Sequence, residues 1–452
     1  MNPKLKPILF RSFYDNNSKH VFGCVWDKTA TSTGTRLGVC MSYTANIGID
    51  DQSVINDFDS APIWGEMEEV TDSLGNVFIR IPKFYIRKRS IAGLLSKEVS
   101  KYQYDGFYLP KCFWDFTNEV ELPYFDFGKF TAGLNTTKLT SVADINPLVG
   151  TNIVYFRTYA ENNNAGGLLG YQQFDIHAYD ALVTLMQIEF ATLDIQSVMQ
   201  GFTVGQFLAT HTLTADTNPA GNTLVVANAI GALYRVGQSI GVGTTLGGNQ
   251  RFYGRVITHI GVDTPSAGST TITFDGDVVA LTTGDILYNV GWKNGFSYDI
   301  AASSGCIVAN DGKYPCSYRG IENPYGNVWQ WVDGVNITAR QAWVCDDADD
   351  YASNLFAVPY KQLSYVNAST NNYVKEMGFD ANNPFAEFPE SVDVVGNTPY
   401  KDYYYQNTAY YVARVGGYWN TTPGAGLSCW DLSAISSDTR VTVGGRLLKK
   451  SI

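Results

Sequence analysis

The side chains best suited to catalysis or metal binding are few in this sequence and lie far apart. The histidines are His20, His177, His211 and His259, and none belongs to an HExxH or HxH pattern that would place two zinc ligands on one element. His177 falls beside a predicted helix start, where a structural role is the usual one. These positions therefore predict no zinc site.

Acidic side chains gather once, between residues 346 and 350. Carboxylate oxygens are the ligands that Ca²⁺ prefers, so this run is a candidate calcium site, although the EF-hand spacing is absent. The alternative is a solvated acidic turn. The residues concerned are Asp346, Asp347, Asp349 and Asp350.

Residues suited to recognition are better represented, near the end of the chain. Tyrosine and tryptophan rings supply contact area at a low entropic cost, and serine and asparagine supply adaptable hydrogen bonds. The six tyrosines of residues 400–411 cannot all be buried with satisfied hydroxyl groups. Tyrosines that line a core strand are the competing interpretation. The predicted ligand-contact residues are Tyr403, Tyr404, Tyr405, Asn407, Tyr410, Asn420, Thr421, Thr422, Ser428, Trp430 and Asp431.

The stretch that must position these residues is 318–336, which reads YRGIENPYGNVWQWVDGVN. Its Asn-Pro and Gly-Asn pairs are typical of turns, so a strand should begin after a tight turn. Side chains alternate in a strand, which places Trp329 and Trp331 side by side on one face. We expect Gly334 to end this strand.

Two further motifs follow this stretch, RVGGYW at residues 414–419 and GGRLL at residues 444–448. The order GN-V-W-x-W-V-D, GG-x-W and G-x-R-L resembles the C-type-lectin-like fold of the formylglycine-generating-enzyme family. It is more similar to phage tail and tropism-determinant proteins, which display a receptor-binding surface on this fold. The resemblance implies a ligand surface between the last two motifs. It also implies a structural scaffold of Asn327, Trp329, Trp331, Gly416, Gly417, Trp419, Gly444 and Arg446.

The formylglycine-generating enzymes use a reactive cysteine pair, so the cysteines need a separate argument. An odd number of them in a long chain favours buried free thiols made in a reducing cytoplasm. Cys429 lies between the last two motifs, but no second cysteine is near it in the sequence, and no helix N-terminus or basic cluster would lower its pKa. The cysteines are at positions 24, 40, 112, 306, 316, 345 and 429.

We therefore expect no enzymatic activity. The less favoured alternatives are an oxidase of the formylglycine-generating type and a glycan depolymerase. A depolymerase needs two carboxylates held about 5–9.5 Å apart, and the sequence alone does not pair its acidic residues.

Local patterns predict several other elements. Residues 20–40 read as two strands around a Thr/Ser/Gly turn, and Gly75-Asn76 reads as a hairpin. Residues 115–170 are polar and loop-rich, and residues 367–400 are expected to form a long loop.

A helix is predicted from residue 176. Asp175 can cap it, and apolar residues recur at helical spacing from Ile176 to Phe190. We expect this helix to continue to Gly201.

The chain of 452 residues is too long for one ordinary core, so two or three domains are expected. Between residues 202 and 290 charge falls, Thr, Gly and Val rise, and short strands recur, which predicts an inserted β-barrel or sandwich. The expected fold class is α+β, rich in β-structure and loops, with a C-type-lectin-like domain that carries a small all-β insert. The predicted segments are a docking arm (1–17), the first half of the lectin-like region (18–201), the insert (202–290) and the C-terminal lectin-like domain with its ligand-binding loops (291–452).

The net charge of −11 argues against nucleic acid or an anionic membrane as a partner. The sequence contains no run of about 18 apolar residues, so we expect no membrane span. The resemblance implies a virion protein of the phage tail tip or fibre, made in the host cytoplasm and assembled with other tail proteins. A homotrimer would then present its aromatic loops to a host cell-surface glycan or protein, and weak contacts would add through multivalency. A structural baseplate or capsid-decorating protein is the alternative.

Overall fold

The computed structural model describes residues 18–28, 32–47, 54–217, 220–262, 268–300 and 302–452. The predicted docking arm, residues 1–17, lies outside the described residues. The fold is mostly β-sheet and includes a sheet curled into a half-barrel. Within the described residues, no helix is both long and apolar enough to cross a membrane.

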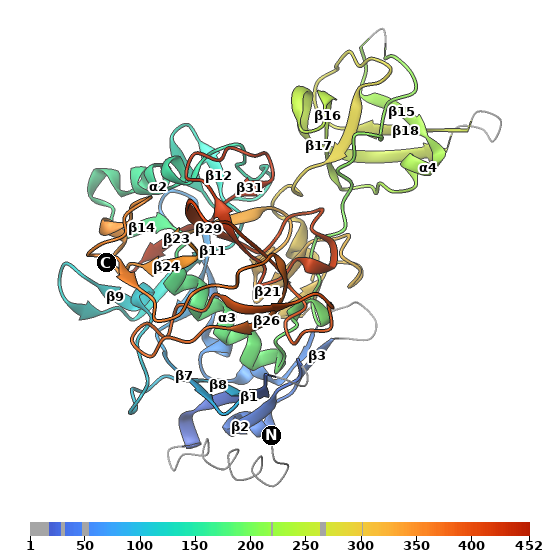
Figure 1. Ribbon diagram of the computed structural model, residues 1–452. Helices are drawn as coiled ribbons and strands as arrows, with labels where there is room; N and C mark the ends of the chain where they lie inside the picture. The colour runs from blue at the N-terminus through green and yellow to red at the C-terminus, as the bar shows by residue number, and fades with distance from the viewer. Residues whose placement is uncertain (1–17, 29–31, 48–53, 218–219, 263–267, 301) are drawn as a thin grey trace.

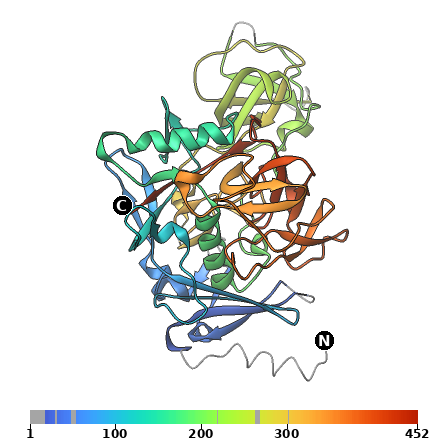
Figure 2. The ribbon, with the colours of Figure 1, turned by 60° about the vertical axis from the view of Figure 1, so that its left-hand side comes forward.

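Helix α3 (Ile176–Phe190) runs through the middle of the main body, and every one of its side chains is buried. Asp175 caps it by accepting a hydrogen bond from the backbone N–H of Ala178 at 2.8 Å, which confirms the predicted start. Figures 1 and 2 show α3 between the N-terminal strands and the C-terminal strands. The helix is therefore the surface on which both halves of the chain pack.

The C-terminal end of α3 differs from the prediction. The helix stops at Ala191, which has a left-handed backbone with φ 50°, and does not continue to Gly201. The Arg36 guanidinium donates to two of the last carbonyl oxygens of the helix, at 2.7 and 2.6 Å. A cation at this position also interacts favourably with the helix dipole, so the end is fixed by a contact from another part of the chain.

The N-terminal part of the chain forms an antiparallel sheet beside α3, with the strand order β2-β1-β8-β7. The pairing of β1 with β2 confirms the two strands predicted within residues 20–40. The strands are β1 (Phe22–Asp27), β2 (Thr35–Gly38), β7 (Tyr85–Ile91) and β8 (Leu94–Ser100).

A second antiparallel sheet brings the end of the chain beside segments of its first half. The C-terminal strand β32 pairs with both β11 and β14. Strands β5 and β6 flank Gly75 and Asn76, which confirms the predicted hairpin. In sheet order the strands are β14 (Tyr171–Gln173), β32 (Leu447–Lys450), β11 (Tyr124–Gly128), β6 (Val77–Pro82) and β5 (Glu68–Thr71).

The largest sheet of the described residues contains the two tryptophans, on β23. Gly334 lies inside this strand with φ 78°, and the residues around it bulge out of register with β29. The prediction that Gly334 ends the strand is wrong, because glycine accommodates the bulge. The expected long loop at 367–400 instead contains a strand pair, β26 with β27. The strands are β23 (Trp329–Thr338), β24 (Gln341–Val344), β25 (Lys361–Gln362), β26 (Asn372–Met377), β27 (Pro389–Asp393), β28 (Tyr403–Gln406), β29 (Tyr410–Val415), β30 (Trp430–Ala434) and β31 (Val443–Gly444).

The segment predicted as an insert forms an antiparallel sheet with its own hydrophobic core, and it projects from the main body (Figure 1). At its base the Tyr253 hydroxyl donates to the Val441 carbonyl at 3.4 Å. The long strand β17 pairs with β16 along one half and with β18 along the other. Gln206 and Asn289 exchange two hydrogen bonds of 2.7 Å, so the chain enters and leaves this body at adjacent points. The elements are β15 (Thr223–Ala227), α4 (Asn228–Gly231), β16 (Ser239–Thr245), β17 (Gly248–Val262), β18 (Ser269–Phe274) and β19 (Ile286–Asn289).

Helix α2 (Ile153–Glu161) corrects the expectation of loops throughout residues 115–170. Asn152 caps it by accepting the backbone N–H of Tyr155 at 3.1 Å. Short strand pairs complete the body: β3 (Ala45–Ile47) with β4 (Val54–Asn56), β9 (Trp114–Asp115) with β10 (Val120–Glu121), β12 (Gly133–Asn135) with β13 (Lys138–Thr140), and β20 (Ser304–Cys306) with β21 (Cys316–Tyr318) and β22 (Ile321–Glu322). The 3-10 turns are η1 (Ser18–His20), η2 (Val39–Ser42), η3 (Asp57–Ser60), η4 (Trp64–Glu66), η5 (Lys111–Phe113), η6 (Asn162–Gly167), η7 (Ile195–Ser197), η8 (Phe296–Asp299), η9 (Ala348–Asp350) and η10 (Thr422–Gly424).

Candidate binding sites

The turn before β23 holds three distant parts of the chain together through Asn327. Its backbone N–H donates to the Phe202 carbonyl at 2.8 Å, and its side-chain Oδ1 accepts from the backbone N–H of Trp292 at 2.7 Å. The Asn327 carbonyl accepts the N–H of Trp419 at 3.1 Å. Asn327 has φ 57°, a left-handed conformation that asparagine tolerates. This residue therefore joins both ends of the insert to the GG-x-W motif.

Arg446 of the last motif is fully buried and satisfies its whole guanidinium group. It donates to the side chain of Gln330 and to four backbone carbonyl groups, at distances of 2.8–3.0 Å. These contacts fasten the end of the chain to the turn before β23.

The side-by-side tryptophans of β23 flank a buried cation. The Arg414 guanidinium lies 5.3 Å from the Trp329 ring centroid and 5.9 Å from that of Trp331. Asp431 and Asp438 hold it at 2.6 and 3.0 Å. The expected scaffold residues are all buried, namely Asn327, Trp329, Trp331, Gly416, Gly417, Trp419, Gly444 and Arg446.

Four predicted contact residues lie in the interior, which corrects the expectation that they face a ligand. Trp430 packs against Tyr179 and Phe388, with ring centroids 4.7 and 4.9 Å apart. In β28 only Tyr404 points into the core, as alternation in a strand requires. Strand β30 is covered on both faces, so the adjacent Trp430 and Asp431 are both buried. The buried four are Tyr404, Ser428, Trp430 and Asp431.

The other predicted contact residues reach the surface at least in part. Tyr403 and Tyr405 lie on the face of β28 opposite Tyr404, with ring centroids 4.9 Å apart. Tyr373 of β26 meets Tyr403 at 5.2 Å, and Tyr405 also packs against the buried Trp329 ring at 6.0 Å. These three partly exposed rings, Tyr373, Tyr403 and Tyr405, are the tyrosine ladder. Asn407, Tyr410 and Thr422 are exposed, and Asn420 and Thr421 are partly exposed.

The acidic run does not form the calcium site considered from the sequence. Asp346 pairs with Lys361 at 2.6 Å, and the Asp347 carboxylate accepts the backbone N–H of Asp349 at 3.2 Å. Across the described ranges, no group of three or more His, Cys, Asp or Glu side chains is placed to hold a metal ion. Asp346, Asp347, Asp349 and Asp350 thus form a hydrogen-bonded turn around η9.

The cysteines, His177 and His211 are buried, whereas His20 and His259 are exposed. All seven cysteines lie among the described residues as buried free thiols. Burial, with Asp402 and Asp431 nearby, raises the pKa of Cys429, which disfavours the thiolate that a nucleophile requires. His177 lies 3.5 Å from Asp346 through its Nε2 atom, and its ring packs on Phe385.

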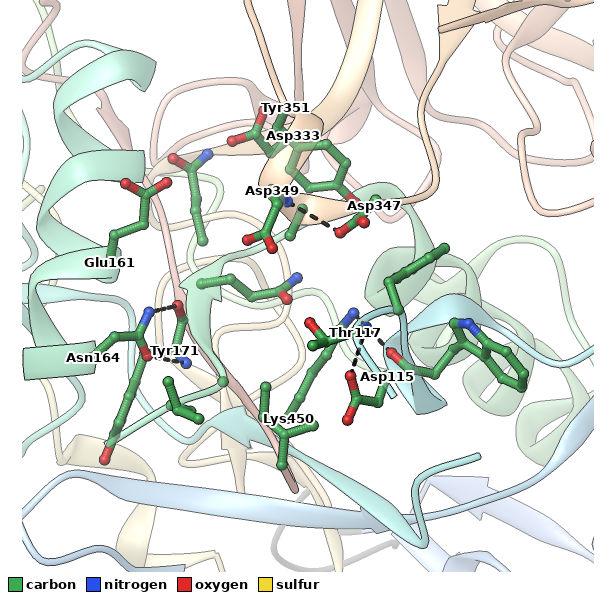
Figure 3. A pocket seen from close by; sticks show the side chains of 18 of the residues that line it. Asp115, Thr117, Glu161, Asn164, Tyr171, Asp333, Asp347, Asp349, Tyr351 and Lys450 are labelled. Atoms are coloured by element: carbon green, nitrogen blue, oxygen red, sulfur yellow. Dashed lines mark hydrogen bonds between the residues drawn. The ribbon is translucent and has the colours of Figure 1, made fainter. Parts of the chain in front are cut away.

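A cavity that the sequence did not predict opens between α2, β14 and η9 (Figure 3). Its volume is about 310 Å³. Trp114 and Tyr351 supply aromatic surface, and the carboxylates of Glu161 and Asp349 point into the same space from opposite walls. We call it the acidic cavity, lined by parts of residues 114–118, 157–173, 347–351 and 450–452 and by Asp333.

One ion pair fixes a wall of the acidic cavity. Arg157 donates to both carboxylate oxygens of Asp333, at 2.8 and 2.7 Å. Burial, together with Asp333 and Asp349, raises the pKa of Glu161. Burial also raises the pKa of Asp347. The cavity therefore concentrates negative charge beyond what its own cations neutralise.

One local sequence feature indicates this cavity, the acidic run around residue 347. Apart from Asp333, the other walls come from segments about a hundred residues away or more, so no local pattern could join them. A scan against protein-family models and a search of curated proteins found no match to this chain.

Proposed function

We propose that the protein is a receptor-binding protein of a phage virion, and that it attaches to a glycan or protein on the host cell surface through the tyrosine ladder. The order of the three sequence motifs supports the virion role. The observation that carries the binding role is the ladder itself, in which three partly exposed rings meet at 4.9 and 5.2 Å. The rings meet at interplanar angles of 83° and 52°, and together they offer rigid aromatic contact area to a sugar or to a protein.

Binding through the ladder would be strengthened by the presence of several copies of the protein on one particle. A small surface of this kind binds weakly as a single copy, and several copies on one particle raise the effective affinity. Asn420 and Thr421 offer polar groups in the same C-terminal segment. The proposed mechanism is therefore adsorption without covalent chemistry.

The test is binding of the labelled full-length protein to a panel of intact bacterial isolates that includes the host. The double variant Tyr403→Ala/Tyr405→Ala removes the ladder. Tyr102→Ala is the matched control, because Tyr102 is an exposed tyrosine that contacts His20 edge to face in the N-terminal region.

Strain-selective binding that falls at least tenfold in the double variant and persists in Tyr102→Ala would support the proposal. Equal binding by wild type and double variant would move the site away from the ladder. Absence of binding to every isolate would contradict adsorption and favour a structural baseplate or capsid role.

A further inference from the structure

We propose that the acidic cavity is a second binding site, separate from the tyrosine ladder, and that it takes a sugar ring carrying a positively charged amino group. The proposal goes beyond receptor binding by the ladder and does not depend on it. It rests on an unpartnered buried amide, on the charge of the cavity and on its aromatic wall.

The unpartnered amide belongs to Gln173, which lines the cavity. Its side chain is only 2% exposed, and neither its nitrogen nor its oxygen has a hydrogen-bond partner among the described residues. A buried amide left unpaired is costly, so such a group points to an occupant. A hydroxyl group both donates and accepts, and it would satisfy either atom of the amide.

The neighbouring residue, Gln172, has a hydrogen-bond partner, so the unpartnered amide is specific to Gln173. Gln172 also lines the cavity, but its nitrogen donates to Asp175 at 2.5 Å. Asp175 in turn accepts from the Tyr351 hydroxyl at 3.1 Å. Gln172 is thus part of the scaffold around the α3 cap, whereas Gln173 is free to meet a ligand.

The charge of the cavity favours a cation. Five carboxylates line it against two cationic side chains, Arg157 and Lys450. Arg157 is engaged with Asp333, and Lys450 donates to the Trp114 carbonyl at 3.2 Å. Glu161 and Asp349 have no salt-bridge partner in the part of the chain that the structure describes, and they face the same space (Figure 3). An ammonium group placed between them would relieve their repulsion.

The size and walls of the cavity suit a sugar better than a bare cation. Its volume of about 310 Å³ lies at the lower end of small-molecule sites, which span roughly 300–1,000 Å³. Trp114 lines the cavity with aromatic surface for a sugar face, and the Lys111 ammonium lies 4.9 Å from the centroid of the same ring. A metal ion would need a converging set of ligands, and no such set occurs within the described residues.

The experiment is isothermal titration of the full-length protein at pH 6.5 with four probes: glucosamine, glucose, N-acetylglucosamine and 1,6-diaminohexane. Glucosamine should bind at least tenfold more tightly than either neutral sugar, because only it carries the charge. It should also exceed the diamine tenfold, because the diamine has no hydroxyl group for Gln173. Equal binding of all probes, or no binding of glucosamine, would overturn the proposal.

Two variants and one control locate the site. Glu161→Gln keeps the shape and removes one charge, so it should weaken glucosamine binding at least fivefold. Gln173→Leu should weaken it by a similar factor. The ladder variant Tyr403→Ala/Tyr405→Ala should bind glucosamine as the wild type does, which separates failure of this proposal from failure of receptor binding.

Two further results would also overturn the assignment. Unchanged glucosamine affinity in both Glu161→Gln and Gln173→Leu would place the ligand elsewhere. Shortening of chitosan oligomers by the wild type would identify a hydrolytic site in place of a binding site.

Discussion

The C-terminal segment 403–431 and the acidic cavity differ in whether amino-acid composition or tertiary packing makes them candidate binding sites. The segment has the composition of a binding surface, yet Tyr404 and Trp430 are in the core while Tyr403 is at the surface. The cavity is built from several separate segments, of which only the acidic run has a distinctive composition, yet it holds an unpartnered amide and unneutralised carboxylates. Composition therefore indicates what a segment can contribute, and the packing decides which side chains are available. Substitutions in both regions test this difference.

The largest effect should come from Trp430→Ala. Trp430 is fully buried between Tyr179 and Phe388, so its removal leaves a cavity that costs about 3–5 kcal/mol in the free energy of unfolding. Chemical denaturation measures this loss. Tyr403→Ala on the ladder is the comparison and should cost less than about 1 kcal/mol, as is common for surface positions. Similar losses in the two variants would contradict the division between core and surface.

The next effect concerns Asp431, a predicted contact that proves to be structural. Asp431→Asn removes the closest carboxylate from the buried Arg414, which is then left with Asp438. Breaking a buried ion pair of this kind should cost about 3 kcal/mol in unfolding free energy. Thermal and chemical unfolding would measure it, with Ser433→Ala as a control that removes only a hydroxyl bound to the same carboxylate. A neutral result for Asp431→Asn would show that Asp438 alone holds the arginine.

Substitution of the two adjacent glutamines of the cavity by leucine should change the free energy of unfolding in opposite directions. Gln173→Leu removes a buried amide without partners and should stabilise the protein by about 1 kcal/mol. Gln172→Leu breaks a hydrogen bond to Asp175 and should destabilise it by about 1 kcal/mol. Denaturation of both variants without ligand makes the comparison. A loss of stability in Gln173→Leu would mean that the amide is satisfied in solution.

The smallest effect is a pH dependence at Glu161. Its pKa is raised in the folded protein, so the folded state binds the proton more tightly than the unfolded state does. The stability from this residue is fully present below the ordinary glutamate pKa and is lost as pH rises through the raised value. Glu161→Gln should remove that loss, on the order of a few tenths of a kcal/mol because the side chain is exposed. Parallel unfolding curves at pH 4 and 7 test it; an identical pH response in wild type and variant would contradict the raised pKa.

The sequence predicted those elements whose causes are local. The cap at Asp175, the hairpin at Gly75 and the strand that carries Trp329 all depend on neighbouring residues. Helix α2 was missed although Asn152 is a readable cap, because its surroundings are rich in loop-forming residues.

Features that depend on distant residues were not predictable. The C-terminal end of α3 is bound by Arg36, which lies on the distant strand β2. The inside and outside of β28 could not be assigned without knowing which face the core covers, so Tyr404 was placed with Tyr403. Tyr373, the third ring of the ladder, was missed because it belongs to a different strand.

The paired hydrogen bonds between Gln206 and Asn289 have a consequence for how such a chain can change over time. Because the two ends of the insert lie side by side, the segment between them can be lengthened, shortened or exchanged at little entropic cost to the rest of the molecule. A gene for this protein can acquire a new module at this position in a single recombination event. The position is equally a practical attachment point for a fluorescent domain or an affinity tag.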